Sequence, residues 1–448
     1  MNNLFILIYV ILFITVCNRL LKKDLKWFII FFGLLFCFSP LMQYVIFPEY
    51  KTTLGYRSVS LHRIFFEYVN TFILIVATLT FRTLKTRTNA LTVFKFLLLL
   101  WFVFNLLSVY NSIEISRSIG VFFMTIVNPI LFAFLFNNRK ILENSMNFLL
   151  TFFTVILLFN LGVKYFSVLY NLGRGAISVW SIGYGAMEFG TFRSNSGTNF
   201  LSIFLPLAFL KSTFIKNERL RKYFEILKWI IIFTFIITGS RMGYFVFGLG
   251  LIIAFYTKQI NFKQGLNLLL VAIIASTTFA YLNEESIFDF LENRFTNKGD
   301  TAIESAENDE RLLLWENALE DSQNNSISGV GAGNYFLVYE KYSNSHNLFV
   351  NILFERGILV LILLVSLIIF ALRRYKRNLR ILMNPEEHTF FSLMGFGLIL
   401  YLVASLTGDS FISISQTVHS FPAYIFMVFI SFPFFYYNFK MNNSERIN

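Results

Sequence analysis

Four side chains beside apolar segments of this sequence could take part in chemistry. Arg193 precedes an apolar run, Arg241 lies within one, and Arg311 begins a stretch with the spacing of an amphipathic helix. His346, one of only 4 histidines, stands before Asn347 at the start of another apolar run. Arginine binds phosphate oxygens through paired hydrogen bonds and stays charged, and histidine accepts a proton near neutral pH. These residue types suit a reaction in which a hydroxyl group attacks and a diphosphate leaves.

Each of the four residues also has a simpler interpretation when it is considered alone. An arginine inside a membrane helix costs about 3 kcal/mol on insertion scales, so Arg241 could instead mark a tight external hairpin and reach water. Arg311 could be a solvated residue among acidic neighbours. Arg193 could be an ordinary loop residue, and His346 an interfacial histidine that hydrogen-bonds to its loop. Because four such residues on one face could form a single cationic pocket, we favour a shared anionic ligand.

The sequence offers little for a metal ion or a cofactor. It contains no Asp-x-Asp pair, no HExxH motif and no cluster of His, Cys and Asp at ligand spacing. Without a divalent ion, side chains must balance the charge of a leaving diphosphate, which again favours arginine. We therefore expect a metal-independent reaction without a cofactor.

The composition predicts a protein that crosses the membrane many times. The chain has 448 residues, of which 56% are hydrophobic and 14% charged, and its mean hydropathy is +0.62. A soluble protein would carry about 25% charged residues, whereas repeated apolar runs of about 20 residues are typical of membrane helices. A β-barrel would show short alternating segments instead. We therefore predict an all-α polytopic membrane protein with about 12–13 transmembrane helices.

The distribution of charge predicts the orientation of these helices. A net charge of +12 would suggest nucleic acid in a soluble chain, but here most Lys and Arg lie in alternate loops, as in cytoplasmic loops of membrane proteins. The opposite loops, 49–63, 170–198 and 283–346, are therefore predicted to be external.

The N-terminus lacks a basic start and a cleavage site, which favours a retained helix over a signal peptide. Cys17 and Cys37 lie in the first two apolar runs and imply neither a disulfide framework nor a thiolate metal site.

The apolar runs divide the chain into series of helices around one large external loop. We expect N-terminal transmembrane helices at 1–170, central ones with external arginines at 171–282, an external catalytic loop at 283–346 and C-terminal helices at 347–448. The individual helices are predicted at 2–19, 26–48, 64–81, 91–109, 118–136, 146–169, 199–215, 226–239, 242–257, 264–282, 347–372, 389–408 and 417–437.

The loop at 283–346 is the only external segment large enough for structure of its own. Its stretch "NDERLLLWENALEDS" (308–322) predicts an amphipathic helix near the membrane. "SGVGAGNYF" (328–336) predicts a glycine-rich turn, which superficially resembles a dinucleotide fingerprint. Since no strand or βαβ unit accompanies it, we expect neither nucleotide nor nucleic acid as a ligand.

Three stretches of this sequence occur in the order found in a known family. They are "TGSRMGYFVFGLGL" (238–251), "RLLLWENALEDSQNNSISGVGAGNYF" (311–336) and "HNLFVNILFERGILVLILL" (346–364). Over roughly 190–370, the chain resembles the core of the bacterial O-antigen polymerase and O-antigen ligase superfamily. The resemblance implies an all-helical membrane glycosyltransferase of the C superfamily, metal-independent and inverting. It also implies a polyprenyl-diphosphate-linked glycan as the donor.

The resemblance implies roles for individual residues as well. His346 would be the general base, and Arg311 would act with it as the second catalytic residue. The stretch that follows Arg193, "RSNSGTNF", lacks the Asn-Pro-Asn pattern of many relatives and keeps only its final asparagine. The residues expected to bind diphosphate or sugar are Arg193, Arg241, Asn199, Asn347 and Tyr335.

Further residues near these positions are expected to support the site. Glu355 and Gly357 would shape a helix start, and Trp315 is expected to pack against the membrane more readily than to stack on a sugar. Asp409 and His419, at the outer ends of two predicted helices, are reserve candidates for the base.

Three functions are compatible with this pattern. The first is a polymerase that transfers a glycan from polyprenyl diphosphate to another lipid-linked repeat unit, as for O-antigen or capsule polysaccharide. The second is a ligase that transfers the glycan to a lipid A core or a protein hydroxyl, and the third is a transporter of lipid-linked glycans. We favour the polymerase on the form of the loop motifs, and the transporter least because no internal repeat is visible. Expected partners are the lipid-linked oligosaccharide, membrane lipid and a chain-length regulator, in the inner membrane with the site on the periplasmic face.

Overall fold

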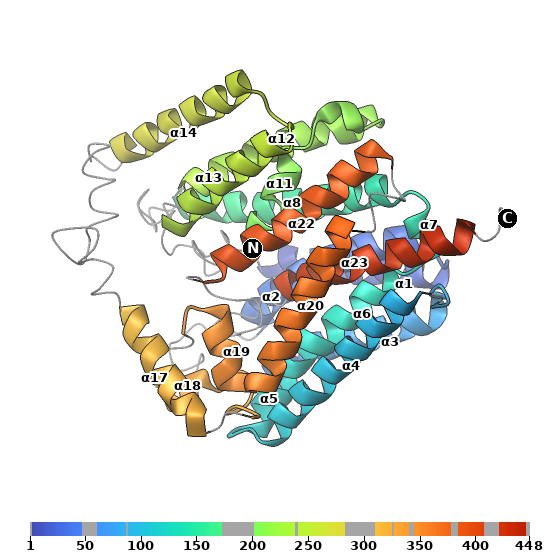
Figure 1. Cartoon of the computed structure of the whole chain (residues 1–448), viewed down its shortest axis with the longest axis vertical. Helices are drawn as coiled ribbons and strands as arrows, with labels where there is room; N and C mark the ends of the chain where they lie inside the picture. Colours follow the sequence, from blue (N-terminus) through green and yellow to red (C-terminus); the bar gives the residue numbers. More distant parts are fainter. Residues whose placement is uncertain are drawn as a thin grey trace.

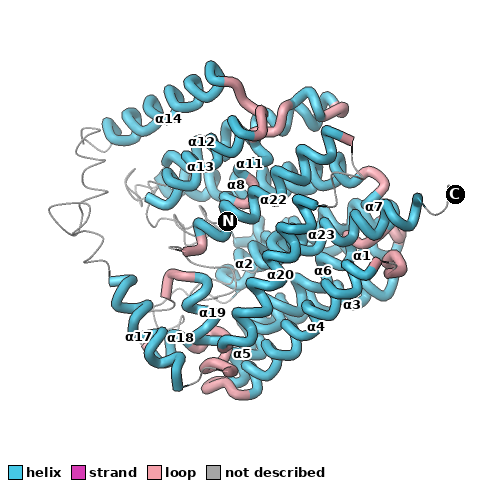
Figure 2. The backbone as a smooth tube through the Cα atoms, in the orientation of Figure 1, coloured by secondary structure: helices cyan, strands magenta, loops and turns pink. Residues whose placement is uncertain are grey.

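Helices make up the regular structure of the described part of this protein. In the computed structural model, every regular element of these residues is helical, and no strand occurs among them (Figure 2). The prediction of an all-α polytopic membrane protein is therefore confirmed. The structure describes residues 2–46, 61–86, 88–172, 201–237, 241–282, 310–324, 327–339, 345–377, 384–406 and 421–444.

The first half of the described chain forms a group of long helices beside the shorter segments α5, η3, α6 and α7 (Figure 1). A continuous apolar run becomes two α-helical pieces, α5 and α6, joined by the π-helix η3. The bounds are α1 (Asn2–Leu21), α2 (Leu25–Ile46), α3 (Leu61–Thr80), α4 (Asn89–Tyr110), α5 (Ile115–Phe122), η3 (Phe123–Val127), α6 (Asn128–Leu135), α7 (Arg139–Leu142) and α8 (Ser145–Leu172).

The second half contains further long helices and the short helices of the predicted external loop. Figure 1 places α17, α18 and α19 at the opposite side of the molecule from α7 and the C-terminal end of α23. The bounds are α11 (Leu205–Ala208), η4 (Ser212–Phe214), α12 (Glu218–Ile237), α13 (Arg241–Tyr256), α14 (Phe262–Leu282), α17 (Glu310–Asn324), α18 (Tyr335–Val338), α19 (Leu348–Arg356), α20 (Ile358–Arg377), α22 (Pro385–Ala404) and α23 (Phe421–Ser444).

Many of these helices are apolar enough to cross a membrane. Shorter apolar helices occur at Ile6–Leu21, Leu25–Cys37, Tyr68–Thr80 and Met242–Tyr256. Six segments of the described residues have both the length and the composition of a membrane span: Asn89–Tyr110, Ile115–Leu135, Ser145–Gly162, Ile358–Lys376, Pro385–Ala404 and Pro422–Asn443.

Besides the π-helical turn within 118–136 and the earlier start of α12, two of the predicted helices are broken in the structure. Within 199–215, the described residues form only short turns such as α11, because Pro206 lacks an N–H group and begins a new helix instead of continuing one. The predicted helix at 347–372 is two helices, since α19 ends at Arg356 and α20 begins at Ile358. Gly357 between them has φ +83° and ψ 171°, a backbone conformation that is essentially restricted to glycine.

Helix α23 forms the centre of the helical core. It packs against α4, α6, α20 and α22, and its residues are apolar on all sides, as expected of a helix surrounded by protein. Aromatic contacts dominate this packing. The rings of Phe94 and Phe434 stack with centroids 4.4 Å apart, and those of Phe36 and Tyr424 lie 4.2 Å apart. The last helix of the chain therefore joins helices from both halves.

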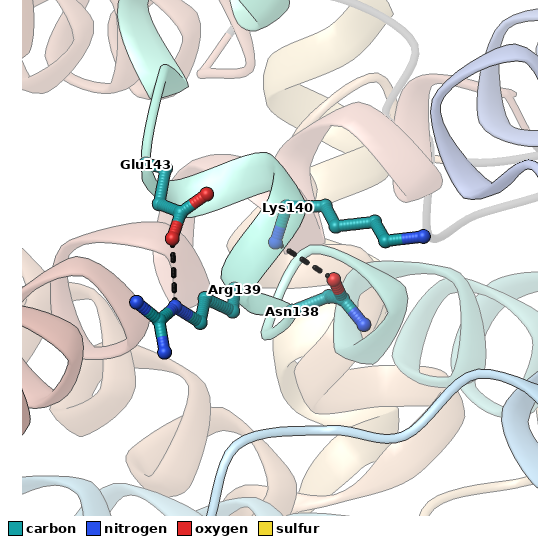
Figure 3. Close-up of polar contacts among 4 residues, drawn as sticks. All are labelled: Asn138, Arg139, Lys140 and Glu143. Atoms are coloured by element: carbon teal, nitrogen blue, oxygen red, sulfur yellow. Dashed lines mark hydrogen bonds and ion pairs between the residues drawn. The ribbon is translucent and has the colours of Figure 1, made fainter.

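The loop around α7 illustrates the face that the charge distribution predicts to be cytoplasmic. Asn138 caps α7: its side chain accepts a hydrogen bond of 3.0 Å from the backbone N–H of Lys140 (Figure 3). Arg139 and Glu143 form an exposed ion pair of 2.7 Å, drawn in the same view. The Asn138 side chain also donates to the carbonyl of Arg82 at 2.7 Å. The contact between Asn138 and Arg82 connects two predicted cytoplasmic loops. The exposed ion pair adds little stability.

Gly357→Ala should destabilise the protein by about 3 kcal/mol. The native φ is costly for any side chain, and a Cβ atom at this position would overlap the carbonyl oxygen of Ile327. Thermal unfolding of the detergent-solubilised chain measures the loss. Gly248→Ala in α13 is the matched control, because a Cβ there meets open space, and alanine is the better helix former by about 1 kcal/mol. Equal losses for both variants would contradict the assigned role of Gly357.

Candidate active site

His346 has an uncommon backbone conformation at the start of α19. Its φ of +55° lies in the left-handed region, which non-glycine residues rarely adopt and which is enriched at functional sites. The next residue, Asn347, is the N-cap of α19 and accepts hydrogen bonds from the backbone N–H groups of Phe349 at 2.9 Å and Val350 at 3.2 Å. The cap fixes the helix start, and with it the position of the half-buried His346.

Ser345, on the other side of His346, is held by several elements. Its carbonyl accepts a hydrogen bond of 2.6 Å from the indole N–H of Trp315 in α17. Its backbone N–H donates to Oδ1 of Asn351 at 3.2 Å, and its hydroxyl donates to the carbonyl of Asn347 at 3.0 Å. The segment that carries His346 is therefore fixed from α17 as well as from α19.

A further contact joins the start of α19 to the end of α22. The backbone N–H of Leu348 donates to the carbonyl of Ser405 at 2.9 Å. The N-terminal N–H groups of a helix need such partners, because they have none within the helix. Three helices thus determine where His346 lies.

Helix α17 turns one face toward α19 and the segment at His346. Leu314 and Ala318 are buried on that face, and Trp315 reaches Ser345 from it. Arg311 lies one helical turn before Trp315, and residues four apart in an α-helix share a face. The predicted helix in this stretch is confirmed, and it brings Arg311 toward the part of the structure that contains His346. The apolar residues Leu312, Leu313 and Leu319 are exposed on other faces of the helix.

The predicted glycine-rich turn lies on the end of α19. The backbone N–H of Val330 donates to the carbonyl of Phe354 at 3.1 Å, and that of Gly331 donates to the carbonyl of Glu355 at 2.8 Å. The backbone N–H of Ile113 donates to the carbonyl of Val330 at 3.1 Å on the other side of the turn. The last carbonyls of α19 thereby obtain partners, and the turn joins α19 to the α4–α5 junction.

Side chains reinforce this junction. Asn334 donates through Nδ2 to the hydroxyl of Ser112 at 2.6 Å and to the carbonyl of Val330 at 3.0 Å. The hydroxyl of Ser118 donates to the carbonyl of Ala332 at 2.8 Å. Gly331 has φ +98°, and a side chain there would overlap Ser112, so glycine permits the close approach.

Three charged side chains are almost completely buried beneath the turn. Glu355, Arg356 and Arg117 are each 1% exposed. The Glu355 carboxylate accepts from the backbone N–H of Tyr335 at 3.2 Å and lies near both guanidinium groups. Burial raises the pKa of Glu355, while N–H donors and the two arginines oppose that effect. Burial lowers the pKa of Arg356 to about 10, so that this residue, just outside the span that begins at Ile358, stays charged at neutral pH.

Arg356 reaches two N-terminal helices. Its Nη1 donates to Oδ1 of Asn105 in α4 at 2.7 Å, and its Nη2 donates to the hydroxyl of Thr125 at 2.9 Å. Thr125 lies in η3, whose π-helical turn contains an additional residue and is a feature often found at functional sites. The π-helix thus presents a hydroxyl to a buried cation.

Tyr335, which is predicted to bind sugar, packs between other aromatic side chains in this structure. Its side chain is fully buried, with ring centroids 4.8 Å from Tyr339 and 5.2 Å from Phe354. Its hydroxyl donates to the carbonyl of Leu314 in α17 at 3.4 Å. Tyr339 donates to the carboxylate of Asp321, and burial together with this carboxylate raises the pKa of the phenol. The ring faces of Tyr335 are occupied by protein, so the tyrosine supports α17.

The other predicted site residues are placed to different extents. Arg241 is the first residue of α13, at the end of that helix opposite Tyr256. Arg193 and Asn199 lie outside the described residues, as do Asp409 and His419. Among the predicted site residues that the structure describes, Arg311 and His346 thus lie on neighbouring elements. These two are the predicted catalytic pair.

Sequence analysis missed the buried arginines of this region. Arg356 was placed inside a predicted helix, and Arg117 at the edge of another, without a role for either. The sequence does contain a signal for both arginines, because a cation at the edge of an apolar run is costly and therefore needs a structural reason. Within the described ranges, no group of three or more His, Cys, Asp or Glu side chains could hold a metal ion.

A comparison with models of known protein families found a match that includes most of this region. Residues 226–365 match a family model described as O-antigen ligase, and no curated protein matches the chain. Within this segment, the match confirms the predicted resemblance to the superfamily of O-antigen polymerases and ligases. The O-antigen ligase match contains Arg241, Arg311 and His346, whereas Arg117 lies before it.

Arg356→Met should destabilise the protein by about 3–5 kcal/mol, because it removes one partner of a buried charged group. It also removes a positive charge near Glu355, which raises the pKa of that carboxyl further. A carboxyl whose pKa is raised in the folded state destabilises the fold as pH rises through that pKa, so the loss should be larger at neutral than at acidic pH.

Thermal unfolding at several pH values measures this effect. Arg139→Met is the matched control, since it breaks the exposed ion pair of Figure 3 and should cost less than about 1 kcal/mol. Similar, pH-independent losses for both variants would show that Arg356 has no special part in the fold.

Proposed function

We propose that this protein is a polysaccharide polymerase. It transfers a growing glycan from polyprenyl diphosphate to another lipid-linked repeat unit, at the periplasmic face of the inner membrane. The O-antigen ligase match and the multi-pass helical fold support this class of reaction. The observation that carries the proposal is the left-handed backbone of His346, fixed by the Trp315–Ser345 hydrogen bond to the helix that contains Arg311.

In the proposed reaction, His346 removes the proton from a sugar hydroxyl of the acceptor. The hydroxyl oxygen attacks the anomeric carbon of the donor glycan and forms the new glycosidic bond. At the same time the bond between that carbon and the diphosphate oxygen breaks, and polyprenyl diphosphate leaves with the electron pair. The attack inverts the configuration of the anomeric carbon.

Arginine side chains would stabilise the charge that develops on the diphosphate. Arg311 has the guanidinium group suited to bind two phosphate oxygens at once. We propose that Arg193 and Arg241 add positive charge to the same leaving group and that Asn199 assists them. The fixed position of α17 matters because donors that are already oriented stabilise a transition state without reorganisation.

The family description favours a second candidate, an O-antigen ligase. A ligase would use the same donor and the same base, but would place the glycan on a lipid A core or a protein hydroxyl. The decisive assay supplies the purified protein with lipid-linked repeat units and measures glycan length and released polyprenyl diphosphate. Longer glycans without an added core support the polymerase, and products that need the core support the ligase. The absence of product under both conditions would favour a transporter.

His346→Asn should reduce transfer about 10²- to 10⁴-fold, the usual contribution of a general base. Asparagine adopts positive φ more readily than most residues, so the variant should keep the native fold while it lacks the imidazole. His346→Ala should lose as much activity and also some stability. The glycan-length assay and thermal unfolding separate the two effects. Near-normal transfer by His346→Asn would reject His346 as the base.

Arg311→Lys should remain about 10- to 100-fold less active than the natural protein, and close to Arg311→Ala. A lysine keeps the charge but loses the paired hydrogen bonds, which are worth about 1.5–3 kcal/mol to a charged group. Glu316→Ala on an exposed position of α17 is the control and should retain activity. Full activity of Arg311→Lys would reduce the role of Arg311 to that of a simple positive charge.

A further inference from the structure

A second site lies at the face that the charge distribution predicts to be cytoplasmic. The C-terminal ends of α13 and α20 and residues 388–399 of α22 line an open cavity of about 580 Å³. The cavity contains none of the residues assigned above to the transfer reaction. Helix α22 packs against both α13 and α20, so the space lies between helices.

The cavity is positively charged at one end. Arg373, Lys376 and His388 contribute to its lining, and none of the lining residues is acidic. The nearby carboxylate of Glu387 accepts a hydrogen bond from Tyr436 at 2.9 Å and pairs with Lys440 at 3.6 Å, both on α23. That acid is directed to another helix, and the cavity keeps a positive charge.

Two further charged residues, Arg374 and Glu386, belong to the same helices but do not line the cavity. The guanidinium carbon of Arg374 lies 3.4 Å from the ring centroid of Tyr437, so this arginine stacks on α23 instead of lining the cavity. Glu386 belongs to the first turn of α22 and is not part of the lining. Neither changes the sign of the charge that a ligand would meet.

Apart from the hydroxyl groups of Thr257, Thr389 and Ser392, the rest of the lining is apolar or aromatic, and it continues to an exposed apolar surface. Phe396 and Ile399 follow one another along α22, and Ile399 is exposed. Tyr256 at the end of α13 is 80% exposed. Gly395 faces Tyr375 and adds no side chain to the space between α20 and α22. A small ion would leave these walls unused, whereas a molecule with an anionic head and an alkyl chain would cover both parts.

We propose that this cavity binds an anionic phospholipid of the surrounding membrane. Its phosphate lies between Arg373 and Lys376 beside His388, and an acyl chain follows Phe396 and Ile399 toward the hydrocarbon. Basic residues at the cytoplasmic ends of membrane helices are suited to anionic headgroups. The lipid thereby joins α13, which begins at Arg241, to α20, which follows the helix of His346.

Lipid-dependent thermal unfolding of the full-length, delipidated protein tests this inference. Dioleoyl phosphatidylglycerol should raise the melting temperature, because a ligand that binds only the folded state stabilises it. Dioleoyl phosphatidylcholine and inorganic phosphate should not. Arg373→Ala/Lys376→Ala should weaken the affinity for phosphatidylglycerol about 30-fold, which corresponds to about 1 kcal/mol for each charge.

Two further variants separate the site from general surface charge. Ser392→Phe fills the cavity without a change in charge and should also abolish the shift. Arg221→Ala/Lys222→Ala also removes one arginine and one lysine, but from an exposed surface of α12. This variant should keep the full shift in melting temperature.

The outcomes that overturn the proposal are distinct. Equal shifts with both phospholipids would mean that headgroup charge is not recognised, and an equal shift with phosphate alone would exclude the lipid. An unchanged shift in both cavity variants would exclude this site.

Discussion

The hydrogen bonds between the glycine-rich turn and the end of α19 position the rest of the candidate active site. The carbonyls of Phe354 and Glu355 accept from Val330 and Gly331 because α19 ends there. It ends because Gly357 adopts a conformation that other residues avoid. Through this junction, helices α17 and α18 acquire a fixed place relative to His346. An uninterrupted helix at 347–372 would leave the turn without these acceptors.

The buried charges beneath the turn link the matched domain to the N-terminal helices. Arg356 lies within the segment that matches the O-antigen ligase family, and its partners Asn105 and Thr125 lie outside it. Burying charges is costly, and such groups often add less stability than apolar packing would. Here these groups determine how the helices are placed, because the guanidinium group of Arg356 fits only where α4 and the π-helical turn present both acceptors. The N-terminal helices are therefore part of the support for the candidate active site.

The two ends of the helical body differ in their chemistry. The end predicted to be external presents a histidine just before α19 and an arginine on α17, held by backbone hydrogen bonds and buried charges. The opposite end contains a cavity with basic and apolar walls between long helices. The proton transfer proposed for the first end would need a fixed side chain, whereas the lipid binding proposed for the second would need only charge beside an apolar surface.

The sequence by itself determined the fold class and the residues best suited to the chemistry. Long apolar runs must become helices in a membrane, since backbone groups have no other partners there, and the motifs around Arg311 and His346 were visible from residue type and order. The tertiary structure decided the break at Gly357, the burial of Tyr335 and the roles of Arg117 and Arg356. Arg356 contacts residues 251 and 231 positions away in the chain. Local patterns do not contain such contacts, because they arise only when separate helices pack together.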